Sequence, residues 1–192
     1  MKSRTLFIVE IAIFAALGFI FDLISNALSI SLWPQGGSVS IAMVPVFLMA
    51  YRWGVKGGVI TGLLLGMLQI LSGTAYILHP VQGFLDYIVA FSVLGFSGIV
   101  FKQIQHEKDN TKKRMAFAII GVLVGSGLRF MTHVAAGMVF FGSGAAEGQS
   151  VLTFSIIYNL TYMVPSILVS GALMILLITT APRVIFNKAL QN

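Results

Sequence analysis

The sequence places ionisable side chains inside two stretches that are otherwise apolar. HPVQGFLDYIVAF contains a single carboxylate, Asp86, followed directly by Tyr87. LRFMTHVAAG carries Arg129 and His133 four residues apart, so these two side chains share one face of a helix. A lone acid among aromatic rings and imidazole suits an organic cation, which it can bind by charge and by cation–π contact. The alternative is structural, with Asp86 pairing with Arg129 or His133 to tie two helices together.

The composition shows what kind of chain must position these residues. Of the 192 residues, 57 % are hydrophobic and 9 % are charged, and the mean hydropathy is +0.95. A soluble domain carries about 25 % charged residues. This chain cannot cover its own surface with polar groups, and we predict an integral membrane protein. It contains no cysteine, which excludes disulfides and thiolate metal sites.

Six apolar segments are candidate membrane helices, because a helix needs about 20 apolar residues to cross a bilayer. They cover about residues 6–30, 40–53, 54–73, 81–102, 115–141 and 152–181, and the second is short. The first is longer than the apolar core of a cleaved signal peptide, which is about 7–15 residues. We predict one all-α membrane domain over residues 1–192 with six transmembrane helices. Glycines at every fourth position from 54 to 66 predict a face for close helix packing.

The net charge of +6 comes from basic residues whose positions indicate how the chain is oriented in the membrane, and they do not indicate a nucleic-acid partner. Eleven of the twelve Lys and Arg residues lie at the termini or in the second and fourth connections, and the other connections contain none. The positive-inside rule places both termini and the linker KQIQHEKDNTKKR in the cytoplasm. We therefore predict a multi-pass protein of the plasma membrane that contacts the lipid bilayer and binds no nucleic acid.

The polar residues within the spans indicate binding rather than catalysis. An ionisable group at bilayer depth costs about 2.5–3.5 kcal/mol, so it faces a partner or a wet cavity. Asp22, in the outer half of the first helix, is either a second polar contact or a packing residue. The chain has no H-E-x-x-H and no adjacent acids for a metal, and neither Ser126 in VGSGL nor Ser143 in FGSGA stands in a G-x-S-G motif, so we expect no enzyme, metal or cofactor. It also lacks G-x-x-x-x-G-K-[ST], so ATP hydrolysis must come from partner subunits.

The whole chain resembles the thiamine-binding ThiT family, which are substrate-binding (S) components of energy-coupling factor (ECF) transporters. The resemblance rests on the order and spacing of AIFAA, PQGGSVS, HPVQGFLDY, LRFMTHVAAG and YNLTYMVPS. It implies a six-helix protein that binds a vitamin from outside and docks on a membrane coupling subunit driven by two ATPases. Members of the family are thought to topple in the membrane to release the ligand inside.

The resemblance also assigns roles to residues of this chain. The family motif commonly has Glu before Tyr, whereas Asp86 here carries one methylene less. Phe141 and Phe154 stand where relatives can carry Trp and Tyr, which keeps stacking and loses polar groups. The implied ligand-binding residues are Asp86, Tyr87, His133, Asn159, Tyr76, Phe141, Phe154 and, as an aromatic of the lid, Trp33. The implied docking surface for the coupling subunit is the A-x-x-x-A pair Ala12 and Ala16.

Thiamine agrees with these residue types, because it combines a permanently cationic thiazolium, an aminopyrimidine and a hydroxyethyl tail. Asp86 would offset the positive charge or accept a hydrogen bond from the amino group, while Phe141 and Phe154 would stack on a ring. Two alternatives stay open. One is an S component for riboflavin, biotin or a thiamine precursor, and the other is a membrane assembly protein without a solute. An aromatic-lined pocket favours solute binding, and a dry Asp86–Arg129 pair favours assembly.

Overall fold

The computed structural model describes residues 2–28 and 37–186, and every regular element in these ranges is helical. Five helical segments are long and apolar enough to cross a membrane: Arg4–Leu28, Met43–Leu71, Pro80–His106, Thr111–Phe140 and Val151–Thr180. The prediction of an all-α protein with several membrane-spanning helices is confirmed. Trp33 lies outside the described residues.

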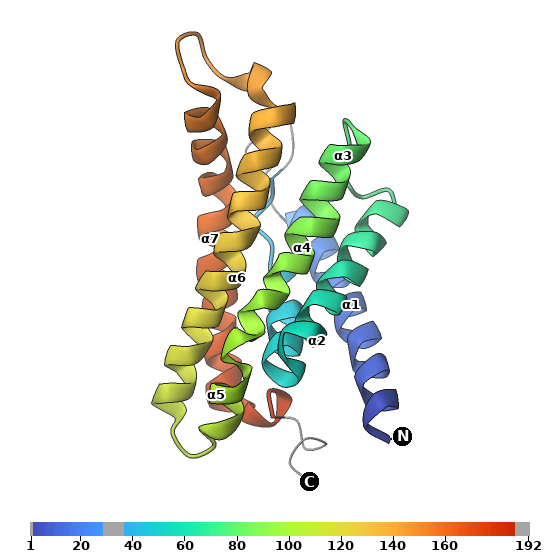
Figure 1. Cartoon of the computed structure of the whole chain (residues 1–192), viewed down its shortest axis with the longest axis vertical. Helices are drawn as coiled ribbons and strands as arrows, with labels where there is room; N and C mark the ends of the chain where they lie inside the picture. The colour runs from blue at the N-terminus through green and yellow to red at the C-terminus, as the bar shows by residue number, and fades with distance from the viewer. Residues whose placement is uncertain (1, 29–36, 187–192) are drawn as a thin grey trace.

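Figure 1 shows the arrangement of the helical elements along the chain. In chain order they are α1 (Lys2–Leu28), α2 (Met43–Leu71), α3 (Pro80–Gly83), η1 (Phe84–Val89), α4 (Ala90–Val93), η2 (Leu94–Val100), α5 (Phe101–His106), α6 (Thr111–Phe140), η3 (Gly142–Gly144), α7 (Val151–Thr180) and η4 (Pro182–Val184). The third span is the continuous run from α3 to α5, in which η1 is a π-helical turn and η2 a 3-10 segment. A π-helical turn inside a longer helix frequently marks a functional site.

The six-span prediction differs from the structure at α2. The predicted spans 40–53 and 54–73 correspond to two segments of this element, on either side of Gly54. Gly54 has φ 74° and ψ −170°, which only glycine adopts without strain, and the chain turns back sharply there. The segment 43–53 is about 16 Å long at 1.5 Å per residue, about half of a hydrocarbon core of about 30 Å. It therefore does not count as a separate span.

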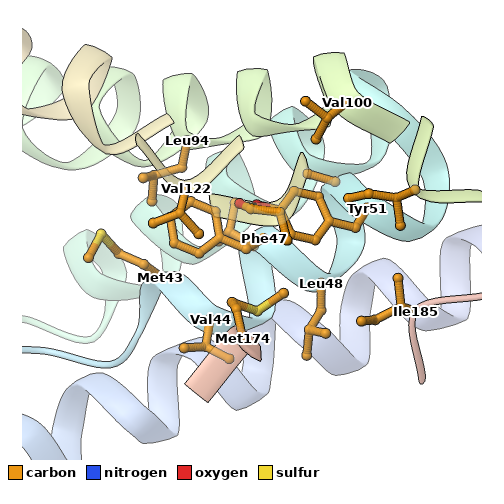
Figure 2. Close-up of a cluster of buried hydrophobic side chains, with 14 of the residues drawn as sticks. Met43, Val44, Phe47, Leu48, Tyr51, Leu94, Val100, Val122, Met174 and Ile185 are labelled. Carbon is orange, nitrogen blue, oxygen red and sulfur yellow. Dashed lines mark hydrogen bonds between the residues drawn. The ribbon is translucent and has the colours of Figure 1, made fainter. Parts of the chain in front are cut away.

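The first segment of α2 forms the centre of the hydrophobic core instead. Its side chains from Met43 to Tyr51 are all buried, so protein rather than lipid surrounds it. Figure 2 shows Phe47 and Tyr51 between neighbours from the third span and α6 on one side and from the C-terminal part of the chain on the other. The Tyr51 hydroxyl donates a hydrogen bond of 2.6 Å to the Ala118 carbonyl of α6. An apolar segment too short to span is thus stabilised by burial on all sides.

The second segment of α2 packs against the third span through its glycine face, as the sequence predicts. A Cβ on Gly62 would lie 2.0 Å from the Phe91 carbonyl oxygen, and one on Gly66 would lie 2.3 Å from the Tyr87 carbonyl oxygen. A Cβ on Gly58 would meet the Gly95 Cα at 2.6 Å. Backbone therefore touches backbone along this interface, and the contact fixes η1, with Asp86 and Tyr87, against α2.

The two ends of the molecule carry different connections. The turn at Gly54, the α5–α6 connection and η4 lie at the end of the molecule where α1 begins, and the α6–α7 connection lies at the opposite end (Figure 1). At the first end, Arg52 donates hydrogen bonds of 2.7 and 2.6 Å to both carboxylate oxygens of Glu10 on α1. It also donates one of 2.6 Å to the Phe186 carbonyl. The basic connections therefore share one end, in agreement with the alternation seen in the sequence.

Candidate ligand-binding cavity

A cavity of about 420 Å³ lies among α1, α2, η1, α6 and α7, and its lining includes Phe141 at the C-terminal end of α6. This volume is within the usual range of small-molecule sites, about 300–1,000 Å³. Its wall combines aromatic rings with neutral polar groups and four ionisable side chains other than tyrosine. These four are Asp22, Asp86, Arg129 and His133. The wall is therefore both polar and aromatic, as the interpretation as a binding site requires.

Asp86 is held by two hydrogen bonds at the wall of this cavity. Gln82 Nε2 donates one of 2.8 Å to Asp86 Oδ2, from one helical turn earlier in the same span. The second joins Asp86 Oδ1 and His133 Nδ1 of α6 at 2.8 Å. The local helix positions Gln82 and Asp86 four residues apart on one face, and the glycine contact with α2 fixes the backbone that carries them.

The contacts of His133 determine its protonation. Arg129 Nε donates a hydrogen bond of 3.1 Å to His133 Nε2, and a guanidinium can only donate. Nε2 therefore carries the lone pair, and the proton lies on Nδ1, from which it is donated to Asp86. The imidazole is neutral in this arrangement. The Arg129 guanidinium also lies 4.1 Å from the centre of the Phe91 ring, a cation–π contact.

The structure thus combines the two interpretations of Asp86 that the sequence left open. Asp86 does join two helices, through His133, and its side chain also lines a cavity. It forms no direct ion pair with Arg129 within the described ranges, where it contacts the neutral imidazole of His133 instead. The dry Asp86–Arg129 pair expected for a purely structural role is therefore not what the structure contains.

A second polar cluster surrounds Asp22 on α1. Ser40 Oγ donates a hydrogen bond of 3.0 Å to Asp22 Oδ1, and Gln69 Nε2 of α2 donates one of 2.6 Å to Asp22 Oδ2. Asn26 Nδ2 adds a third, of 3.1 Å, to Oδ2. Asp22 is 7 % exposed and lines the cavity. The sequence analysis left Asp22 undecided and did not find Gln69, because only the fold brings these elements together.

α7 supplies the remaining wall through residues spaced one turn apart. Asn159 Nδ2 donates a hydrogen bond of 2.8 Å to the Ser155 carbonyl, and the Tyr162 hydroxyl donates a short one to Asn159 Oδ1. The Tyr162 ring meets the His133 ring edge-on, with centroids 6.1 Å apart. Tyr158 meets Tyr162 in the same way at 6.0 Å. Tyr158 and Tyr162 were not among the predicted site residues, although Tyr162, three residues after Asn159, shares its face of the helix.

Six of the eight residues predicted to bind ligand line the cavity: Tyr76, Asp86, Tyr87, His133, Phe141 and Asn159. Phe154 does not line it. Its ring packs over Gly144 of η3, where an added Cβ would lie 2.7 Å from Phe154 Cζ, and tilts against Tyr158. Trp33 lies outside the described residues. Ala12 and Ala16 are both exposed on α1, which is a geometry open to docking.

Apolar helices around a cavity lined by polar and aromatic side chains are typical of a membrane-embedded protein that takes a small solute. The chain matches the family model described as "Thiamine transporter protein" over residues 8–186. It is 46 % identical over 180 residues to thiamine transporter ThiT of Bacillus subtilis, covering 93 % of each chain. It is 27 % identical over 186 residues to thiamine transporter ThiT of Lacticaseibacillus paracasei, covering 94 % of this chain and 90 % of the relative.

A solved structure of ThiT from Listeria monocytogenes superposes with a TM-score of 0.87. It is 33 % identical, and the match covers 96 % of this chain and all of the other. The chain belongs to the ThiT family of thiamine transporters. The predicted family is confirmed, and so is the prediction of a transport protein rather than an enzyme, since the relatives are named as transporters.

Proposed function

We propose that the chain is the S component of an ECF vitamin importer and binds thiamine in this cavity. A membrane coupling subunit and two ATPases would supply the energy, because the sequence has no phosphate-binding loop of its own. The cavity would open to the outside of the cell, and both termini would lie in the cytoplasm with the basic connections. The second and third of the six predicted helices would then correspond to the two segments of α2, of which only the second is long enough to cross the bilayer.

The observation that carries the proposal is the charge of the cavity. With His133 neutral, its wall holds two carboxylates, Asp22 and Asp86, and one guanidinium, Arg129. The sum is one negative charge, which a monocation such as thiamine neutralises. The position of the site among apolar helices makes this balance matter, because an uncompensated charge is costly away from water. Riboflavin and biotin do not bring a permanent positive charge, so the cavity favours thiamine.

The proposed contacts follow from the groups at the wall. Asp86 would accept a hydrogen bond from the ligand, Asn159 and His133 would contact polar ring or tail atoms, and Phe141 would stack on a ring. Tyr76 and Tyr87 would close the site near the α2–α3 connection, where the Tyr87 hydroxyl already accepts a hydrogen bond of 2.7 Å from the Tyr76 amide. Ala12 and Ala16 on α1 would form the surface that meets the coupling subunit.

Calorimetric titration of the purified protein with thiamine, riboflavin and biotin tests the proposal. We expect saturable binding of thiamine alone. If another vitamin binds instead, the protein is still an S component, but thiamine is not its ligand. No binding of any vitamin would favour the assembly protein, for which the polar clusters serve packing only.

Asp86→Asn is the matched variant for this titration. It keeps the shape of the side chain and replaces a charged acceptor by a neutral amide, which removes a hydrogen bond worth about 1.5–3 kcal/mol. Thiamine binding should weaken about 10- to 100-fold while the protein still elutes and unfolds as a folded species. If Asp86→Asn binds thiamine with unchanged affinity, Asp86 only joins two helices and does not contact the ligand.

A further inference from the structure

We infer that Gln82 is a positioning residue of the binding site, which holds the Asp86 carboxylate in the orientation that the ligand meets. The inference rests on the proposed function and adds a residue to its site. Gln82 lines the cavity and is 2 % exposed, so its amide depends on partners within the protein rather than on bulk water.

The orientation of the Gln82 amide is fixed by its partners. The Leu78 amide donates a hydrogen bond of 2.9 Å to Gln82 Oε1, and Gln82 Nε2 donates one of 2.8 Å to Asp86 Oδ2. Turning the amide over would set two donors against each other at Leu78 and two acceptors against each other at Asp86. Gln82 therefore faces Asp86 as a donor, in one defined geometry.

The donors of Gln82 are all in use, which separates its role from that of a ligand contact. Nε2 carries two hydrogens. One is donated to Asp86 and the other, at 3.2 Å, to the Tyr76 carbonyl. Asp86, in contrast, accepts one hydrogen bond at each oxygen, whereas an ionised carboxylate can accept about four. The ligand can therefore bind to Asp86 while Gln82 and His133 hold the carboxylate in place.

The α2–α3 connection in turn holds Gln82. Two of its backbone groups, the Leu78 N–H and the Tyr76 carbonyl, contact the Gln82 amide, so the amide cannot swing away from Asp86 without losing both. The connection also has an anchor of its own, because the Tyr76 N–H donates a hydrogen bond of 2.7 Å to the Tyr87 hydroxyl. Loss of the Gln82 amide would therefore leave Tyr76 attached and remove one of the two donors that orient Asp86.

A double-mutant cycle between Gln82→Met and Asp86→Ala tests whether Gln82 acts through Asp86. Methionine keeps the length of the side chain but cannot donate a hydrogen bond, and alanine leaves no carboxylate to orient. Thiamine is titrated calorimetrically into the natural chain, the two single variants and the double variant. Residues that act through one contact have non-additive effects, whereas the effects of independent residues add.

Gln82→Met should weaken thiamine binding about three- to tenfold in the natural chain, because Asp86 loses one donor and keeps the other, from His133. In Asp86→Ala the same substitution should weaken binding less than about twofold, because no carboxylate remains to be oriented. The same factor in both backgrounds, or full affinity in Gln82→Met, would overturn the inference.

His79→Ala is the matched control for a loosening of the same region. His79 Nδ1 accepts a hydrogen bond of 3.2 Å from the Val81 amide at the start of α3, and its ring stacks on Phe140. The side chain does not line the described cavity. His79→Ala should therefore change thiamine affinity by the same small factor with and without the Asp86 carboxylate. If the His79 cycle is as non-additive as the Gln82 cycle, the coupling reflects general loosening and contradicts the inference.

Three outcomes remain distinct from one another. If Gln82→Met does not fold, Gln82→Asn replaces it, since the amide is then one methylene too short to reach Asp86, and the same two factors decide. If the natural chain binds thiamine and the Gln82 cycle is additive, the inference alone is refuted. If the natural chain binds no thiamine, the proposed function fails and the inference falls with it.

Discussion

Gly62→Ala should destabilise the protein, because this position has no room for a methyl group. The added Cβ would lie 2.0 Å from the Phe91 carbonyl oxygen and 2.6 Å from the Phe91 carbonyl carbon. Real Cβ atoms essentially never approach closer than 3.0 Å, so α2 and α4 must separate by about 1.0 Å, the difference between 3.0 and 2.0. The obstructing atoms are backbone, which cannot rotate away as a side chain can.

The size of the effect follows from two opposing contributions. Overpacking costs about 1–3 kcal/mol, and a rigid backbone neighbour places Gly62 at the upper end. The gain in helix propensity from Gly to Ala offsets about 1 kcal/mol. A net loss of about 2 kcal/mol corresponds to a fall in Tm of about 4–8 °C for a chain of this size. Thiamine should also bind more weakly, because the separation displaces Phe91 and Tyr87, which line the cavity.

Thermal unfolding in detergent, with and without thiamine, measures both effects. Gly127→Ala in α6 is the matched control, since nothing lies within 4 Å of a Cβ added there. That variant should unfold at the same temperature as the natural chain or slightly higher. If Gly62→Ala is as stable as Gly127→Ala and binds thiamine equally well, the backbone contact between α2 and the third span is not as close as described.

Two further predictions concern the aromatic rings near the cavity and the ion pair between Glu10 and Arg52. Phe141→Ala should weaken thiamine binding about tenfold through lost stacking, whereas Phe154→Ala should change it less than about twofold. Only the first ring lines the cavity, and titration of the two variants side by side checks this. Glu10→Gln should lower the free energy of unfolding by about 1–3 kcal/mol, because it weakens the two-point contact with Arg52 and the 2.6 Å bond from Trp53 Nε1. Thiamine affinity should stay the same because Glu10 lies outside the cavity wall, so a large loss of affinity in Glu10→Gln would contradict this separation of roles.

Much of the architecture could be predicted from local pattern. Long apolar runs gave the helices, the positions of basic residues separated the two ends, and the spacing of Gly58, Gly62 and Gly66 gave the packing face. These features depend only on periodicity and composition within one segment. The contact between Asp86 and His133 could also be predicted from the sequence, because ionisable groups inside apolar spans must face a partner or a cavity.

The other features depend on contacts between distant segments. Asp22 has the same sequence surroundings whether it packs or lines a cavity, and only Ser40 and Gln69 decide between the two. The boundary at Gly54 was predicted, but the burial of the segment before it could not be read from hydropathy, because a buried helix and a spanning helix are equally apolar. Phe154 was placed in the site by resemblance, whereas in the fold it covers Gly144, one turn beyond the edge of the cavity.

The burial of the first segment of α2 limits the order in which the core can pack during synthesis. Residues 43–53 leave the ribosome well before α6 and α7, which supply Ala118, Val122, Met174 and Ile178 to the cluster around them. A segment of about 16 Å is too short to enter the bilayer as an independent helix. It must stay paired with α1 and the rest of α2 until the last two spans are inserted. The core, and with it the cavity wall on α7, therefore closes only after α7 has been synthesised.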